Sequence, residues 1–131
     1  MRLPINKKKK ILIVDDSAFD QRLAAKILSS REDLDPVCVS SGDECLEALK
    51  ENNIAMILMD IMMPGKYGTQ ILMDIRKTHS PIELPIIMVT AKTDISDVVG
   101  CIESGANDFL TKPLNFEVTM ARILYCSPIT R

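Results

Sequence analysis

The sequence has no tryptophan, and aromatic residues make up only 4% of its 131 residues. It therefore lacks the aromatic platforms on which nucleic-acid bases usually stack. Its formal net charge of −2 also lacks the positive excess with which domains attract nucleic acid. These two absences argue against direct nucleic-acid binding by this domain.

The sequence has no CxxC pair and no apolar run long enough for a membrane span or a signal peptide. The apolar run behind the basic N-terminus covers only Ile11–Val14. We therefore expect a cytoplasmic protein without membrane contact. The four cysteines lie within apolar or helical patterns, which predicts free core thiols in a reducing cytosol. They are Cys38, Cys45, Cys101 and Cys126.

With 47% hydrophobic and 26% charged residues, the chain has the composition of one globular domain. No repeat, low-complexity segment or internal linker interrupts it. We expect a polar leader over residues 1–9 whose lysines are solvated, a domain over residues 10–126, and a tail or start of a linker over residues 127–131.

Five strand-like apolar runs alternate with five helical patterns. The runs are Lys10–Val14, Pro36–Ser40, Ile54–Asp60, Pro85–Thr90 and Asn107–Thr111. We expect Ser41 and Glu44 to form a capping box, Gly105 to cap a helix over Ile95–Ser104, and a last helix over Asn115–Cys126. The apolar faces of the first four helices contain Phe19, Leu23, Ala24, Ile27 and Leu28; Cys45, Ala48 and Leu49; Ile71, Leu72 and Ile75; and Val98, Val99 and Ile102. This alternation predicts an α/β fold in which helices cover both faces of a parallel sheet.

Asp60 is the one carboxylate in an otherwise apolar run, and a charge delivered by a buried strand needs a partner. The other strands supply candidates, because Asp15 and Asp16 follow the first strand, Thr90 ends the fourth and Lys112 follows the fifth. Carboxyl ends of parallel strands meet at one edge of the sheet, so these five groups can converge. Each also has an ordinary explanation, as a helix cap, a backbone-bonded hydroxyl or a surface lysine, but none of these explains the whole set.

Three neighbouring carboxylates repel one another unless a cation neutralises them, and an all-oxygen site of this charge suits Mg²⁺. Carboxylates also act as nucleophiles toward phosphoryl groups. A lysine and a hydroxyl group supply what the oxygens of a transferring phosphoryl group require. The set therefore indicates phosphoryl chemistry.

Four segments that contain these residues resemble the receiver domain of two-component response regulators. They are ILIVDDS at Ile11–Ser17, ILMDIMMPGKYG at Ile57–Gly68, MVTAK at Met88–Lys92 and FLTKP at Phe109–Pro113. The resemblance covers nearly the whole chain. It implies the three-layer, doubly wound (βα)5 flavodoxin-like fold, with five parallel strands in the order 2-1-3-4-5.

The resemblance also implies a role for each site residue. Asp60 would be the phosphoacceptor, and Lys112 would bridge Asp60 and the phosphoryl group. The bond between Lys112 and Pro113 would be cis. Mg²⁺ would be bound by Asp15, Asp16, Asp60 and the backbone carbonyl of Met62.

A relay to the rest of the domain is implied in the same way. Thr90 would move toward the phosphoryl group and Phe109 would turn inward, which changes the face made by the fourth helix, fifth strand and fifth helix. The partners would be a histidine kinase or histidine phosphotransfer protein and, through that face, an output domain or a second copy. Such a domain assists its own phosphorylation and dephosphorylation but is not a turnover enzyme.

Met62 lies two positions after Asp60, and its side chain bears on the hydrolysis of the aspartyl-phosphate and on one alternative function. A thioether cannot orient a water molecule, so the aspartyl-phosphate should hydrolyse slowly. A haloacid-dehalogenase-like phosphohydrolase, which is the alternative, would need an aspartate there. A flavodoxin-like cofactor binder would need a phosphate-binding loop after the first strand, which is lacking.

We expect His79 to lie on the surface late in the third helix, and the methionines Met56, Met59, Met62 and Met63 to pack in or around the core.

Overall fold

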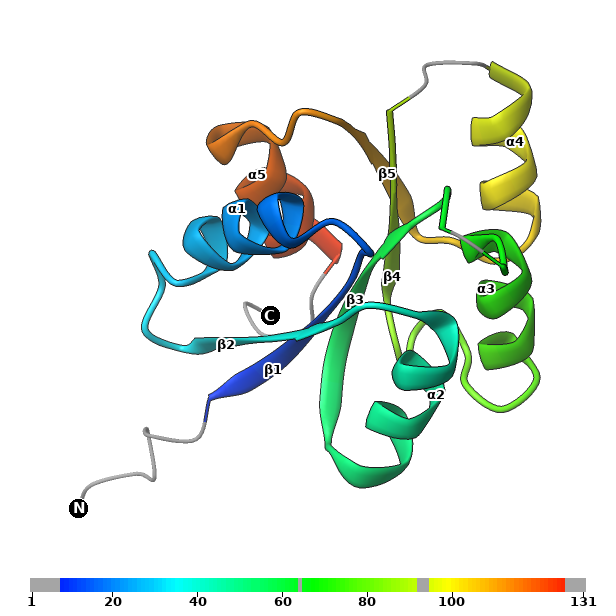
Figure 1. Cartoon of the computed structure of the whole chain (residues 1–131), viewed down its shortest axis with the longest axis horizontal. Coiled ribbons are helices and arrows are strands. Elements are labelled where there is room, and N and C mark those ends of the chain that lie inside the picture. The colour runs from blue at the N-terminus through cyan, green and yellow to red at the C-terminus, as the bar shows by residue number, and fades with distance from the viewer. Residues whose placement is uncertain (1–7, 64, 92–94, 127–131) are drawn as a thin grey trace.

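The computed structural model describes residues 8–63, 65–91 and 95–126 (Figure 1). Residues 1–7 of the predicted leader, the predicted tail 127–131, and Pro64 and Lys92 of the motifs lie outside the described residues. Strands and helices alternate along the chain, as predicted. In order they are β1 Lys9–Val14, α1 Ala18–Leu28, β2 Leu34–Val39, α2 Gly42–Glu51, β3 Ile54–Asp60, α3 Gly68–Arg76, β4 Ile86–Thr90, α4 Ile95–Glu103, β5 Asp108–Thr111 and α5 Phe116–Cys126.

The five strands form one parallel sheet in the order β2-β1-β3-β4-β5, which confirms the predicted topology. From β1 the chain first moves outward to β2 and then returns to the other side of β1 for β3. The connections after β1 and after β3 therefore leave the sheet in opposite directions. Open α/β sheets bind their ligands at this switch point, just beyond the carboxyl ends of the strands.

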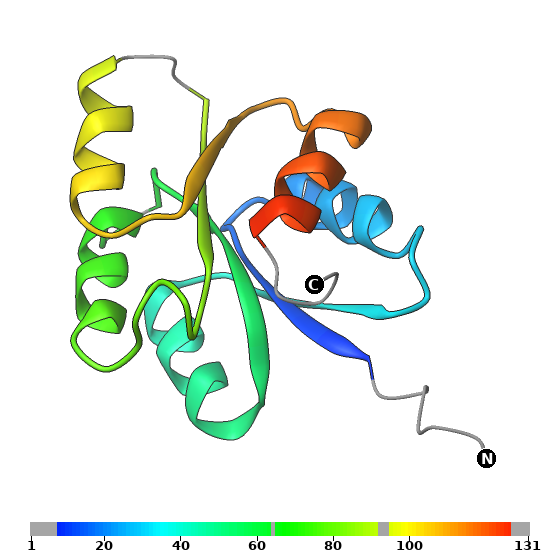
Figure 2. The ribbon, with the colours of Figure 1, turned by 180° about the vertical axis from the view of Figure 1, so that it is seen from behind.

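Helices cover both faces of the sheet, with α1 and α5 on one face and α2, α3 and α4 on the other (Figures 1 and 2). Side chains of each strand alternate between the two faces. In β1, Leu12 and Val14 pack toward α2 and α3, whereas Ile11 and Ile13 pack toward α1 and α5. The central strands β3 and β4 are apolar on both faces because both faces are covered.

Three apolar side chains assigned to helix faces by their spacing are exposed. Phe19 is 67% exposed, and Val99 and Ile102 are each 46% exposed. Phe19 lies in the first turn of α1, whereas the buried residues of α1 begin at Ala24. Among the α4 side chains that the structure describes, Cys101 is the buried one. Helical periodicity identified a face, but it did not show how much of that face another element covers.

The helix ends follow the predicted chemistry with two differences. The Ser41 side chain accepts a hydrogen bond from the backbone N–H of Glu44, 3.2 Å away, as expected for an N-cap. The carboxylate of Glu44, however, accepts from the N–H of Ser40 rather than from that of Ser41. Gly105 has a φ of +107° directly after the α4 segment, which suits glycine. His79 lies beyond the end of α3 and is half-buried.

All four cysteines are free, but only two fit the prediction of a core position fully. Cys45 and Cys101 are buried, Cys126 is half-buried and Cys38 is exposed, because it lies on the edge strand β2. Lys10 lies in β1, as predicted, and its Nζ donates to Oδ1 of Asn52 at 3.1 Å. Among the described residues, no helix combines the length and apolar character needed to cross a membrane.

Candidate functional site

The parallel sheet carries the predicted polar residues to one edge. Asp15 directly follows β1, and Asp60 and Thr90 are the last residues of β3 and β4. Lys112 directly follows β5. Asp60 pairs in register with Val89, and Thr90 pairs with Thr111, so these strand ends are nearly level. The strands thus bring an acid, a hydroxyl and an amine to one edge of the sheet, where Asp15, Asp60 and Lys112 line a small crevice.

The ammonium group of Lys112 lies at the centre of this crevice. Its Nζ is 2.9 Å from Oδ2 of Asp15 and 3.4 Å from Oδ2 of Asp60. The side chains of Asp15 and Asp60 are only 8% and 6% exposed. Asp60 therefore has the partner that its burial requires. The bond between Lys112 and Pro113 is cis, as the resemblance implied.

A third carboxylate, Asp20 in the first turn of α1, also binds Lys112, with 2.9 Å between Oδ2 and Nζ. The sequence analysis did not identify this residue. An acid in the first turn is common because it interacts favourably with the helix dipole, so it gives no distinct signal. The available indication was positional, because the helix that starts after Asp15 and Asp16 begins at the same edge of the sheet.

Backbone amides fix the two buried carboxylates. Oδ1 of Asp15 accepts from the N–H of Ser17 at 2.9 Å, and Oδ1 of Asp60 accepts from the N–H of Met62 at 3.3 Å. Each carboxylate therefore has one oxygen on the backbone and the other on Lys112. Gln21 holds the β1–α1 turn by donating to the carbonyl of Asp15 at 2.6 Å and to that of Val39 at 3.1 Å.

The start of α1 decides between two explanations of its polar residues. Ser17 is the N-cap, and its hydroxyl accepts from the N–H of Asp20 at 3.3 Å. Asp16 is exposed and is not the cap. Its presence next to Asp15 is therefore not explained by helix capping.

The loop after β3 is shaped by a close backbone approach at Gly68. Its N–H donates to the carbonyl of Ile61 at 2.8 Å. A Cβ at this position would overlap the carbonyl oxygen of Asp60. Glycine therefore allows α3 to start directly against the strand that carries the central carboxylate.

The electrostatics of the crevice are unbalanced. Burial, and next the charge of Asp15, raise the pKa of Asp60 to about 6, although Lys112 opposes this. Burial tends to lower the pKa of Lys112, but its hydrogen bonds to Asp15 and Asp20 and the nearby charges raise it overall. Lys112 is thus firmly protonated, while the negative charge of Asp60 is only partly compensated.

Asp15, Asp16 and Asp60 each offer a carboxylate oxygen, and these oxygens lie within 4.8 Å of one another. All three donors are hard oxygen atoms with negative charge, which is the donor set preferred by Mg²⁺. The residues present therefore fit a divalent cation of this kind.

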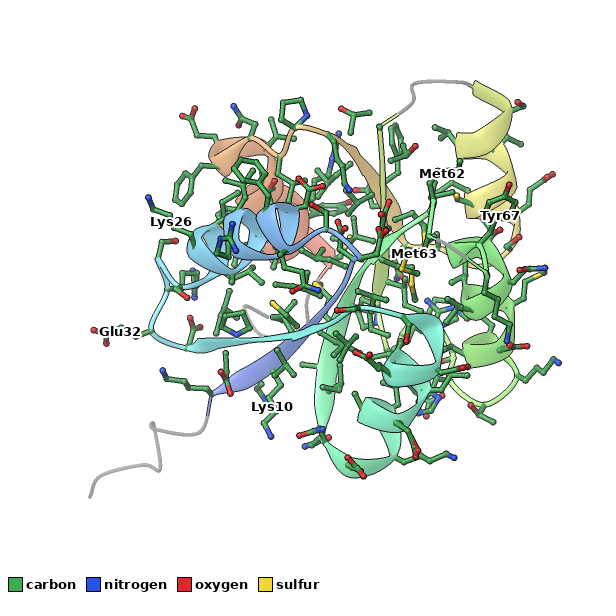
Figure 3. All side chains as sticks on the ribbon, in the orientation of Figure 1. Lys10, Lys26, Glu32, Met62, Met63 and Tyr67 are labelled. Carbon is green, nitrogen blue, oxygen red and sulfur yellow. The ribbon has the colours of Figure 1, made fainter. Side chains whose placement is uncertain are left out.

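The two residues of the expected relay lie on β4 and β5, the two strands at this side of the sheet. Thr90 is 1% exposed at the end of β4. Phe109 pairs with Met88 in the sheet, is partly buried, and packs against the core cluster beneath α2, α3 and α4. Of the four methionines, Met56, Met59 and Met63 are buried, whereas Met62 in the β3–α3 loop is 49% exposed (Met62 and Met63 are labelled in Figure 3).

Comparison with known proteins gives one consistent result. The family model described as "Response regulator receiver domain" matches residues 11–124. The chain is 38% identical over 113 residues to the transcriptional regulatory protein AfsQ1 of Streptomyces coelicolor, covering 86% of this chain and 48% of AfsQ1. It is 34% identical over 116 residues to the DNA-binding response regulator MtrA of Mycobacterium tuberculosis, covering 88% of this chain and 49% of MtrA.

A solved structure agrees with these matches. The crystal structure of a CheY-like response regulator receiver domain protein from Methanospirillum hungatei superposes with a TM-score of 0.81 at 27% identity. The superposition covers 91% of this chain and 93% of that one. By contrast, the chain spans about half the length of the curated relatives that it matches.

Proposed function

Because the chain belongs to the response regulator receiver domain family of two-component systems, we propose that it is a phosphoacceptor switch in which Asp60 receives the phosphoryl group. The observation that carries this proposal is the placement of Asp60. Its carboxylate ends a buried strand at the switch point of the sheet, 3.4 Å from a lysine ammonium. A signalling domain of this kind is distinct from a turnover enzyme, although it assists its own phosphorylation and dephosphorylation.

The donor is a phosphohistidine of a histidine kinase or histidine phosphotransfer protein. An Oδ atom of ionised Asp60 attacks the phosphorus, a P–O bond forms and the P–N bond to the imidazole breaks. The imidazole nitrogen leaves with the bonding electron pair and takes up a proton. Lys112 and the hydroxyl of Thr90 then interact with the phosphoryl oxygens, whose charge they compensate.

Asp15, Asp16, Asp60 and the backbone carbonyl of Met62 would hold Mg²⁺, which when bound neutralises charge on the carboxylates and on the phosphoryl group. The proximity of the three carboxylates supports this assignment. The backbone hydrogen bonds of Asp15 and Asp60 keep both side chains oriented toward the crevice.

The signal leaves through Thr90 and Phe109. We expect Thr90 to move toward the phosphoryl oxygen and Phe109 to repack behind it, which changes the face formed by α4, β5 and α5. Phe109 has no hydroxyl group, so its movement depends on packing alone. That face would contact an output domain or a second copy of the domain.

The domain over residues 10–126 would operate in the cytoplasm, without membrane contact and without binding nucleic acid itself. The printed names of the relatives, a transcriptional regulatory protein and a DNA-binding response regulator, suggest an output function in the part of those proteins that this chain does not span. The exposed thioether of Met62 should leave the aspartyl-phosphate slow to hydrolyse, because it cannot orient a water molecule.

Incubation with acetyl phosphate and Mg²⁺, followed by intact-protein mass spectrometry, tests the proposal. We expect a mass gain of one phosphoryl group that requires Mg²⁺ and is absent in Asp60→Asn. The control Asp43→Asn removes an exposed carboxylate from the first turn of α2 and should retain the gain. Steady release of phosphate over many turnovers, or an unchanged mass gain in Asp60→Asn, would contradict it.

A further inference from the structure

Lys112 shares its three donor hydrogens among three carboxylates, and one of them lies outside the group expected from the sequence. The distances from Nζ are 2.9 Å to Asp15, 2.9 Å to Asp20 and 3.4 Å to Asp60. The two short contacts draw the ammonium toward α1 and the end of β1. The longest contact is the one to Asp60, the carboxylate that we propose as the acceptor.

Asp20 differs from the other two carboxylates in its surroundings. Its side chain is 30% exposed, compared with 8% for Asp15 and 6% for Asp60. Water can therefore replace Lys112 on Asp20 at little energetic cost, whereas a buried carboxylate would be left unpaired. Asp20 is also held in place, because its N–H donates to the N-cap hydroxyl of Ser17.

A small cavity of about 10 Å³ adjoins these contacts and is lined by Asp20, Leu23, Asp60, Lys112 and Leu114, among others. This volume is comparable with that needed by one water molecule. The lysine is therefore not tightly packed on every side, and its ammonium has space to move between carboxylates.

We propose that Asp20 is a positioning residue that holds the Lys112 ammonium away from Asp60 before phosphorylation and releases it once the phosphoryl group is present. This inference rests on the proposed function of Asp60. A phosphoryl group carries a charge of about −1.5 to −2 and strong acceptor oxygens, so it outcompetes the single, partly hydrated carboxylate of Asp20. Asp20 thereby opposes the phosphorylated state.

The first test measures the contact between Asp20 and the Lys112 ammonium in protein without phosphodonor or Mg²⁺. NMR detection of the Lys112 ammonium should show through-hydrogen-bond couplings from Nζ to the carboxylate carbons of Asp15 and Asp20, and a weaker one to Asp60. In Asp20→Ala the coupling to Asp60 should strengthen, whereas Asp20→Glu should preserve the wild-type pattern. Absence of the coupling to Asp20 in the wild type, or no change at Asp60 in Asp20→Ala, would overturn the proposal.

The second test measures the release in phosphorylated protein. The coupling to Asp20 should disappear after treatment with acetyl phosphate and Mg²⁺. We expect Asp20→Ala to gain the phosphoryl group from acetyl phosphate about three- to tenfold faster than wild type, because Lys112 no longer has to leave a charge-assisted contact to reach the incoming group. Asp43→Asn removes a charge at the same edge without touching Lys112, and its rate of mass gain should be unchanged.

An unchanged or slower mass gain in Asp20→Ala, or an equal increase in rate in Asp43→Asn, would overturn the proposed release. A failure of the proposed function is recognised separately, because the wild type would then show no mass gain. In that case the release is overturned as well, while the couplings measured without donor still decide whether Asp20 holds Lys112.

Discussion

The two ends of the sheet each place one basic side chain among buried polar groups, and they use it differently. At the carboxyl end, Lys112 is shared by the carboxylates of Asp15, Asp20 and Asp60. At the opposite end, the partners of the Arg76 guanidinium within the described part of the chain are neutral acceptors at 2.8–3.2 Å. These acceptors are the backbone carbonyls of His79, Ser80, Leu84 and Gly105, and Oδ1 of Asn107.

The polar groups around Arg76 form hydrogen bonds with one another. Oδ1 of Asn107 also accepts from the N–H of Ile86, and its Nδ2 donates to the carbonyl of Pro81. Burial lowers the pKa of Arg76, but a guanidinium remains charged at any physiological pH. This network joins the end of α3 to the loops that precede β4 and β5 and needs no further partner.

The Lys112 end remains incomplete. With Asp16 included, four carboxylates face one ammonium, a formal excess of three negative charges when all are ionised. An excess of negative charge of this size favours the binding of a cation. The two ends therefore differ in that the donors of Arg76 are taken up by neutral acceptors, whereas the carboxylates around Lys112 outnumber their cationic partner.

Removing the Arg76 side chain at the amino end of the sheet should have the largest effect on stability. Arg76→Met removes the donor from several part-buried carbonyls at once, so we expect the free energy of unfolding to fall by about 3 kcal/mol. Urea denaturation between about pH 5 and about pH 8 should show this loss throughout, because no titrating carboxylate takes part. Arg122→Met is the control, since Arg122 is 46% exposed and lies 3.7 Å from Asp108. It should change stability by no more than about 0.5 kcal/mol, and equal losses in both variants would contradict the comparison.

Removing the charge of Asp60 from the carboxyl end of the sheet should raise the free energy of unfolding rather than lower it. Since the pKa of Asp60 is raised to about 6 in the folded protein, the folded state binds a proton more tightly than the unfolded state. The contribution of Asp60 to stability is therefore fully present below the unfolded pKa near 4 and is lost as pH rises through about 6. Without Mg²⁺ at about pH 7.5, Asp60→Asn should be more stable than wild type by about 2 kcal/mol.

The pH dependence separates this effect from a general gain in packing. The advantage of Asp60→Asn in urea denaturation should disappear by about pH 4, where wild-type Asp60 is protonated. Glu32→Gln removes an exposed carboxylate in the connection between α1 and β2 and should match wild type at each pH (Figure 3). An advantage of Asp60→Asn that does not change with pH would show that its charge is not the cause.

Both ends also show how far the sequence could be interpreted. The convergence of Asp15, Asp60 and Lys112 was predictable, because the carboxyl ends of parallel strands must meet at one edge. Asp20 and Arg76 were not, because an acid in the first turn of a helix and a base in its last turn are ordinary helix-dipole partners. Their contacts depend on residues that are distant in sequence, such as Lys112 and Gly105.

The fold was predictable for a related reason. Runs that are apolar on both faces, such as β3 and β4, identify central strands even without a known topology. The exposure of Val99 and Ile102 was not predictable in this way. Periodicity describes one helix at a time, whereas burial depends on what packs against it, and the extent of α4 that is covered is a property of the assembled layers.

The smallest expected effect is the stabilisation by Mg²⁺, which tests whether the two ends of the sheet act independently. A ligand that binds only the folded state stabilises it by RT ln(1 + [L]/Kd), which is about 1.4 kcal/mol at ten times Kd. Mg²⁺ should therefore raise the free energy of unfolding of wild type by about this amount, and that of Asp60→Asn by less, because one charged ligand is lost.

The Arg76→Met variant decides whether that stabilisation belongs to one end alone. Arg76 and the carboxylate cluster share no partner among the residues that the structure describes, so their effects should add within about 0.5 kcal/mol. Arg76→Met should then start from a lower stability and gain as much from Mg²⁺ as wild type does, measured by urea denaturation with and without the ion. A clearly smaller gain would mean that the loops held by Arg76 also position Asp60 through the sheet. The two ends would then form one coupled unit rather than a structural anchor and an unbalanced charge cluster.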